Sequence, residues 1–106
     1  MFYELRQYQI QPGRRDEWVH FMEDTIIPFQ VSLGMVIAGS FVGENDENLY
    51  VWMRRFESEE QRKAQYEAVY QSDYWKNDIT PKVDQMLIRE KISVTRIQAT
   101  PKSVIQ

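Results

Sequence analysis

Hydrophobic and polar positions alternate along residues 2–10 (FYELRQYQI), which are rich in aromatic side chains. This period of two predicts a β-strand, and the Pro-Gly pair at 12–13 ends it. Residues 14–33 instead carry apolar side chains at steps of three and four, which predicts a helix. Pro28 should kink or restart this helix. The apolar stripe consists of Trp18, Phe21, Met22, Ile26, Phe29 and Leu33.

Two short apolar segments follow at residues 35–43 and 49–56, separated by the polar stretch Glu44–Asn48. Turn formers between two such segments predict a β-hairpin. The next segment, Ser58-Glu-Glu-Gln61, has the form of a capping box and should begin a second helix. That helix is expected in two pieces, because Pro81 suits the first position of a new helix.

Residues 88–97 (IREKISVTRI) have the composition of a fourth strand, and residues 98–106 form a tail without a clear period. The resulting order, β-α-β-β-α-β, is that of the ferredoxin-like split motif, an α+β fold with an antiparallel sheet. We therefore expect one domain over residues 1–106, with the strands in the order 4-1-3-2 and both helices on one face of the sheet.

The third strand is apolar on both of its faces, whereas a strand with one face in water should carry polar side chains on that face. Leu49, Val51 and Met53 share one face, and the other face carries Tyr50, Trp52 and Phe56. We expect the helices to leave Tyr50, Trp52 and Phe41 uncovered, and a second copy of the chain to cover them. Two sheets packed face to face about a twofold axis would form a dimeric α+β barrel. A charge at Ile92 in this interior should then dissociate or unfold the homodimer.

Composition narrows the possible functions. The chain has 106 residues, of which 42% are hydrophobic, and a net charge of −3, so we expect no nucleic-acid partner. It has no cysteine and a single histidine, His20, so we predict no metal site, and no cofactor motif is present. No targeting segment or apolar stretch long enough to span a membrane is visible, and we expect a cytoplasmic protein.

One group of charged residues stands out as a candidate ligand site. Glu4 and Arg6 share a face of the first strand, and Arg54 shares a face of the third strand with Trp52. The first and third strands are the central neighbours in this fold, so we expect the four side chains to meet on the face away from the helices. Two arginines against one carboxylate leave a positive excess that suits a small anionic ligand. The alternative is a buried network that only completes the dimer interior.

Other charged residues have simpler explanations. Glu57, Glu59 and Glu60 lie at the start of a helix, where negative charge interacts favourably with the helix dipole, so they do not imply an acid–base pair. His20 falls opposite the apolar stripe and is expected on the surface. Catalytic residues therefore remain unassigned.

The segment from Tyr3 to Gly13 (YELRQYQIQPG) closely resembles the start of NIPSNAP-family domains, where the pattern Y-E-L-R-x-Y-x-I-x-P-G leads into the first helix. Weaker similarities follow at 27–41, 52–60 and 73–75, so the resemblance covers roughly residues 2–100. It implies the dimeric α+β barrel fold, in agreement with the two-faced sheet. The family's biochemical function is largely undefined, and no catalytic residues can be carried over.

Two functions stay open. The first is a homodimer that binds a small, anionic ligand or a protein partner in or near the barrel. The second is a small oxygenase-type enzyme that acts in the barrel cavity, because the wider superfamily includes cofactor-free monooxygenases and haem enzymes. The haem enzymes use an axial histidine, and His20 is misplaced for that role. An open cavity with convergent polar groups would favour a ligand or an enzyme, and a solidly packed interior would favour a structural role.

Overall fold

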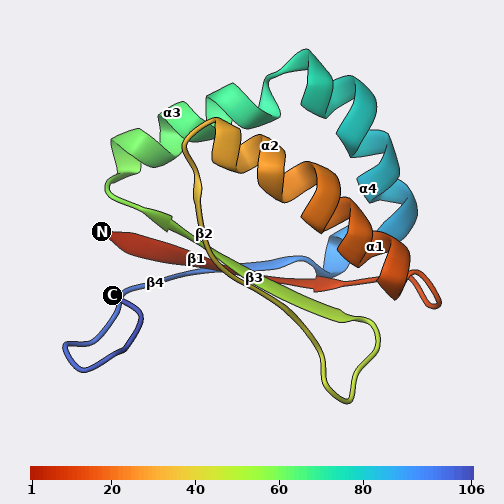
Figure 1. Cartoon of the computed structure of the whole chain (residues 1–106), viewed down its shortest axis with the longest axis horizontal. Coiled ribbons are helices and arrows are strands. Elements are labelled where there is room, and N and C mark those ends of the chain that lie inside the picture. The colour runs from red at the N-terminus through yellow and green to blue at the C-terminus, as the bar shows by residue number, and fades with distance from the viewer.

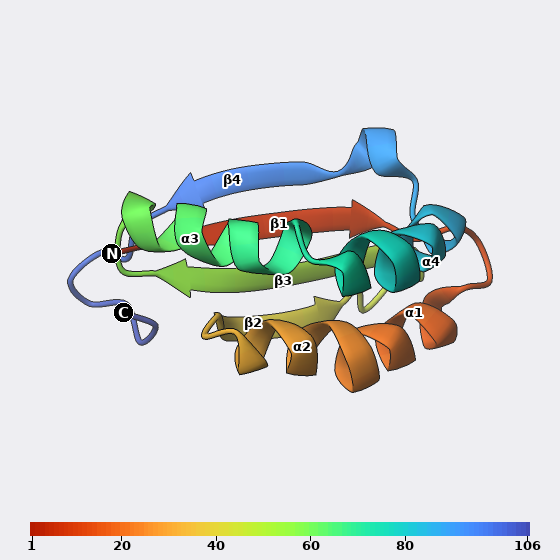
Figure 2. The same cartoon turned by 90° about the horizontal axis from the view of Figure 1, so that it is seen from above.

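The computed structural model describes all residues 1–106, and its four strands form one antiparallel sheet. The order across the sheet is β2-β3-β1-β4, which confirms the predicted ferredoxin-like order (Figure 2). The strands are β1 (Phe2–Gln9), β2 (Val36–Val42), β3 (Leu49–Phe56) and β4 (Ser93–Ile97).

Both helical segments are interrupted where the prolines predict it. The first consists of α1 (Arg15–Phe21), a π-helical turn (Met22–Ile26) and α2 (Ile27–Ser32), with Pro28 in the first turn of α2. The second consists of α3 (Glu59–Tyr70), a π-helical turn (Trp75–Ile79) and α4 (Thr80–Met86), with Pro81 in the first turn of α4. Proline is tolerated there because the first N–H groups of a helix have no partner within it.

The capping box is present at the start of α3. The Ser58 hydroxyl accepts a hydrogen bond from the Gln61 backbone N–H at 3.1 Å. The Gln61 side chain in turn accepts one from the Glu57 N–H at 2.8 Å. Two N–H groups that the helix cannot pair are thereby satisfied, which explains why α3 begins here.

The fourth strand is shorter than predicted. It begins at Ser93 rather than at residue 88, because a 3₁₀ turn over Arg89–Lys91 precedes it. The Ile88 N–H still donates to the Gln9 carbonyl at 2.9 Å, so the chain stays beside β1 through the turn. The turn brings Arg89 to the helix side of the sheet, where it borders a cavity.

All helices lie on one face of the sheet, and the core lies between the two layers (Figure 1). Tyr50 and Trp52 are fully buried in that core, so the expectation that they face away from the helices is wrong. Ile92 also packs against the helix-side core and is not a barrel-interior position. The alternation in β3 was correctly predicted, but its larger side chains pair with the helices, where they meet the buried stripe of Trp18, Met22 and Ile26.

One position of the predicted helical stripe is also different. Leu33 is 37% exposed, and the fully buried side chain near this end of the helix is the polar Gln30. A buried amide requires a partner, and Gln30 finds one in the candidate site.

The face away from the helices is apolar along β2 and most of β3, whereas β1 and β4 also place Gln7, Gln9, Ser93 and Thr95 on it. Phe41 is 53% exposed there, and Leu49, Val51 and Met53 alternate along β3 with fully buried residues. The C-terminal tail reaches this side (Figure 1), where the Tyr3 hydroxyl donates a hydrogen bond to the Gln106 carbonyl. We call this surface the open face, defined by Val36, Phe41, Leu49, Val51, Met53, Leu5 and Ile97.

None of the helices is both long and apolar enough to cross a membrane.

Candidate functional site

The four residues predicted as a site do come together, but between the sheet and the helices. The β1–β3 register pairs Glu4 with Arg54 and Arg6 with Trp52. All four side chains lie on the helix side, so their predicted position in a barrel interior is wrong. The physical reason is that side chains of α2 and α3 supply hydrogen-bonding groups for these charges, as the contacts of Arg54 show.

Arg54 is completely buried and has polar partners in both layers. Its guanidinium donates to the Glu4 carboxylate at 2.9 Å, to the Tyr66 and Tyr70 hydroxyls at 2.9 and 2.7 Å, and to the Gln30 side-chain oxygen at 2.9 Å. Because these partners come from β1, α2 and α3, one side chain ties the sheet to both helical segments. A buried charge is tolerated when it is paired and hydrogen-bonded in this way.

Aromatic rings surround the same guanidinium. Its central carbon lies 4.8 Å from the Trp52 ring centroid and 5.1 Å from that of Tyr66. These distances fit cation–π contacts, which favour a guanidinium over an ammonium group in a desolvated site. Arg54 is therefore a structural centre of the site, and a ligand cannot reach it without displacing these side chains.

Both oxygens of the Glu4 carboxylate have hydrogen-bond partners within the protein. The Tyr66 hydroxyl donates to both of its carboxylate oxygens, at 2.6 and 2.8 Å, and Arg54 donates to one of them. Burial, together with the hydrogen bond to Glu4, raises the pKa of Tyr66 to about 12 against the lowering effect of Arg54. The phenol therefore stays neutral at pH 7 and acts as a donor.

The raised pKa of Tyr66 predicts a loss of stability in alkali. From pH 10.0 to about 12 the unfolded chain loses this proton while the folded chain keeps it. Stability contributed by the neutral phenol is thus fully present below pH 10 and falls as the pH rises through this window. Chemical denaturation across this pH range should show that the free energy of unfolding falls less steeply for Tyr66→Phe than for the wild type. Tyr74→Phe, at an exposed tyrosine, is the matched control, and equal slopes in all three proteins would contradict the prediction.

Arg6 is the cation of the cluster that has no hydrogen-bonded carboxylate. Its guanidinium donates to the neutral hydroxyls of Tyr8 at 2.9 Å and Tyr66 at 3.3 Å, while Glu4 lies 3.9 Å away and is already engaged. The Arg6 side chain is only 16% exposed. The cluster thus carries two guanidinium groups against one carboxylate, and the positive excess predicted from the sequence resides on Arg6.

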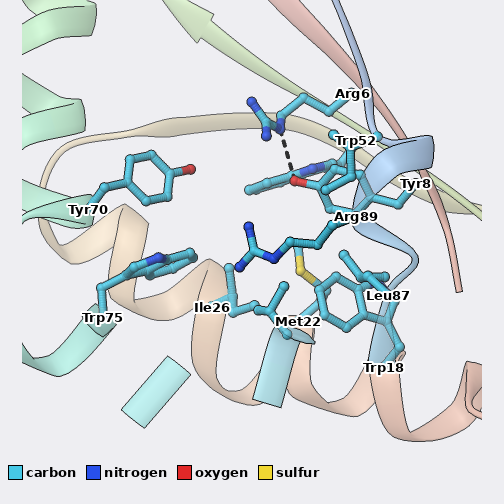
Figure 3. A pocket seen from close by; sticks show the side chains of 12 residues that line it. Arg6, Tyr8, Trp18, Met22, Ile26, Trp52, Tyr70, Trp75, Leu87 and Arg89 are labelled. Carbon is cyan, nitrogen blue, oxygen red and sulfur yellow. Dashed lines mark hydrogen bonds between the residues drawn. The ribbon is translucent and has the colours of Figure 1, made fainter. Parts of the chain in front are cut away.

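Arg6 borders a cavity of about 120 Å³ between the sheet and the helices (Figure 3). The walls are five aromatic and five aliphatic side chains, and the only charged groups are Arg6 and Arg89. No carboxylate and no imidazole lines it. The aromatic members are Tyr8, Trp18, Trp52, Tyr70 and Trp75. An apolar cavity whose ionic groups are all cationic suits a ligand with an apolar body and a negative end.

The other candidate residues lie elsewhere. His20 is exposed on α1 and does not border the cavity. No three residues among the histidines, cysteines and carboxylates gather as metal ligands do. Sequence reasoning missed Tyr66, Tyr70 and Gln30, which hold Arg54, and also Trp75 and Arg89 at the cavity. A usable signal was the spacing of Tyr66 and Tyr70, which puts two hydroxyls on one face of a helix.

Comparison with known proteins gives a family and several solved structures. The family model described as NIPSNAP matches residues 3–101. A NIPSNAP family protein of unknown function from Agrobacterium tumefaciens is 24% identical, with a TM-score of 0.88 and coverage of 100% of this chain and 94% of that one. A NIPSNAP domain protein from Burkholderia xenovorans is 18% identical, with a TM-score of 0.83 and coverage of 97% and 98%. A search of curated proteins gave no match.

A more distantly related solved structure has the same fold. An antibiotic biosynthesis monooxygenase is 14% identical, with a TM-score of 0.69 over 95% of this chain and 100% of that one. This chain therefore shares its ferredoxin-like α+β fold with that structure, which confirms the predicted α+β fold with an antiparallel sheet. At this identity the likeness concerns the fold alone, because one fold supports many functions.

Proposed function

The chain belongs to the NIPSNAP family, and on that premise we propose that it is a homodimeric binding protein for a small anionic ligand with an apolar body. The observation that carries the proposal is Arg6, a largely buried cation at the edge of a cavity lined by apolar side chains, whose one nearby carboxylate lies 3.9 Å away and is hydrogen-bonded to Arg54 and Tyr66. An anion interacts more strongly with such a buried guanidinium than with an exposed one, because water screens the interaction less.

The four residues of the predicted site then take different roles. Arg6 binds the negative end of the ligand, and Trp52 forms part of the apolar wall. Arg54 and Glu4 hold the surrounding side chains in place and do not contact the ligand, because both are buried and hydrogen-bonded to side chains of the protein. The ligand lies within each protomer, between sheet and helices, and not in the interior of the barrel.

Binding is favoured over catalysis by the residues that line the cavity. Proton transfer at neutral pH usually needs an imidazole or a carboxylate, and the lining has neither. The oxygenase-type alternative would use the same cavity, and its support is the fold shared with an antibiotic biosynthesis monooxygenase. If a carboxylate that binds the protein caused uptake of O₂ when it was added, this would favour the oxygenase-type alternative. Recovery of the carboxylate unchanged would favour binding without catalysis.

The homodimer in this proposal is supported by the open face. Phe41 and Val36 are 53% and 40% exposed there, beside the half-buried apolar row of β3. Monomeric proteins seldom leave a large contiguous apolar patch in water. A cytoplasmic location also remains a proposal and rests on the sequence alone.

Arg6→Gln tests the ligand site. We expect it to weaken binding of small monocarboxylates such as hexanoate and benzoate by about 10–100-fold, the usual cost of losing one charge-assisted contact. Titration calorimetry gives the affinity, and thermal unfolding shows whether the fold is retained. Arg15→Gln is the control, because Arg15 lies on α1 and donates to the Gly43 carbonyl away from the cavity. Equal affinities for wild type and Arg6→Gln would refute the site.

A further inference from the structure

Resting on the proposed function, we propose that the ligand is a single-ring aromatic carboxylate, and that Arg89 binds it by exchanging its partner Asp84 for the ligand's carboxylate. Arg6 and Arg89 reach the cavity from different elements, β1 and the 3₁₀ turn before β4. Figure 3 shows both side chains extended toward the side of the cavity where Tyr70 and Trp75 lie.

The size of the cavity limits the ligand to one ring. Its volume is about 120 Å³. An apolar protein cavity of roughly 150 Å³ takes up benzene, and this cavity is smaller, so it has room for no more than one ring. Pockets for drug-sized ligands start at roughly 300 Å³, which argues against polycyclic ligands and nucleotides.

The shape of the walls favours a flat ring. The Tyr70 and Trp75 rings meet edge to face, with centroids 4.7 Å apart and an interplanar angle of 89°. Together with Trp52 they present aromatic surface to the cavity from both the sheet and the helical layer. Aromatic pairs in offset or edge-to-face geometry gain energy beyond their buried area, and a saturated ring cannot reproduce this contact.

The two arginines differ in how firmly they are held. Arg6 is largely buried and bonded to two tyrosine hydroxyls. Arg89 is half exposed, and its one hydrogen-bonding partner is Asp84 of α4, which is half exposed as well. An exposed ion pair of this kind contributes little free energy, so a carboxylate in the cavity can replace Asp84 at small cost.

Asp84 therefore competes with the ligand for Arg89. Substitutions of the two members of this ion pair should change the affinity for the ligand in opposite directions. Arg89→Gln should weaken benzoate binding about tenfold, since one charge-assisted contact is lost. Asp84→Asn should strengthen binding about two- to threefold, because it frees Arg89 at the cost of only a surface pair. A purely structural ion pair would give the same direction of change in both variants.

The experiment is titration calorimetry of the full chain with benzoate and three analogues. We expect saturable binding of benzoate, at least tenfold weaker binding of cyclohexanecarboxylate, and no binding of benzamide or benzylamine up to about 10 mM. Equal affinity for cyclohexanecarboxylate, or equal affinities of wild type and Arg89→Gln, would overturn this inference. If those carboxylates still depended on Arg6, the proposed function would stand, whereas binding of no carboxylate at all would overturn both.

Discussion

Arg54→Met is expected to lower the free energy of unfolding by about 3–5 kcal/mol, the usual cost of removing one member of a buried ion pair. The Glu4–Arg54 pair is only 0–4% exposed, and the substitution would leave the Glu4 carboxylate buried with Arg6 3.9 Å away as its nearest cation. The change also removes the donor to Gln30 and Tyr70, whose oxygens would lose a partner inside the core. Urea denaturation with extrapolation to water gives the measurement.

Arg62→Met provides the matched control for this substitution. Arg62 pairs with Glu59 at 2.6 Å, but that carboxylate is 41% exposed, so we expect a much smaller loss than for Arg54→Met. The double variant Glu4→Gln with Arg54→Met should be more stable than Arg54→Met alone, because no charge is left buried without a partner. A small effect for Arg54→Met, similar to that of Arg62→Met, would show that the cluster does not hold the two layers together.

The sequence predicted the fold because each element carries a local signal that the tertiary structure does not override. The capping box at Ser58 and the prolines at 28 and 81 mark helix starts that depend only on hydrogen bonding within a few residues of the chain. The period of two in β3 likewise predicted which side chains share a face. Where a local preference was weak, as in the turn before Ser93, the predicted boundary was wrong by five residues.

The face on which the site lies could not be predicted in the same way. Both faces of β3 are apolar, and alternation alone does not state which of them the helices cover. The choice is made by complementarity, since Arg54 needs acceptors and Gln30, Tyr66 and Tyr70 supply them from the helices. The cavity depends on side chains from β1, β3, both helical segments and a 3₁₀ turn, so no sequence pattern could reveal it.

Phe41→Glu is expected to convert the proposed homodimer into a monomer. In one protomer Phe41 is 53% exposed, so a carboxylate there costs the isolated chain little. Its ring lies across Gly39, where a Cβ atom would come within 2.5 Å of the ring, so β2 presents a flat aromatic surface. A twofold axis would bury the new charge twice, and each unpaired buried charge costs several kcal/mol.

Light scattering measures the outcome directly. The wild type should have twice the 12.8 kDa mass of one chain, and Phe41→Glu should have the mass of one chain at the same micromolar concentration. Val31→Glu is the matched control, because Val31 is 51% exposed on α2, on the helical layer and away from the open face, and this variant should remain a dimer. Since the cavity lies within each protomer, monomeric Phe41→Glu should still bind benzoate through Arg6. A wild-type chain that is already monomeric would refute the dimer and leave the ligand site untouched, because the two proposals depend on opposite faces of the same sheet.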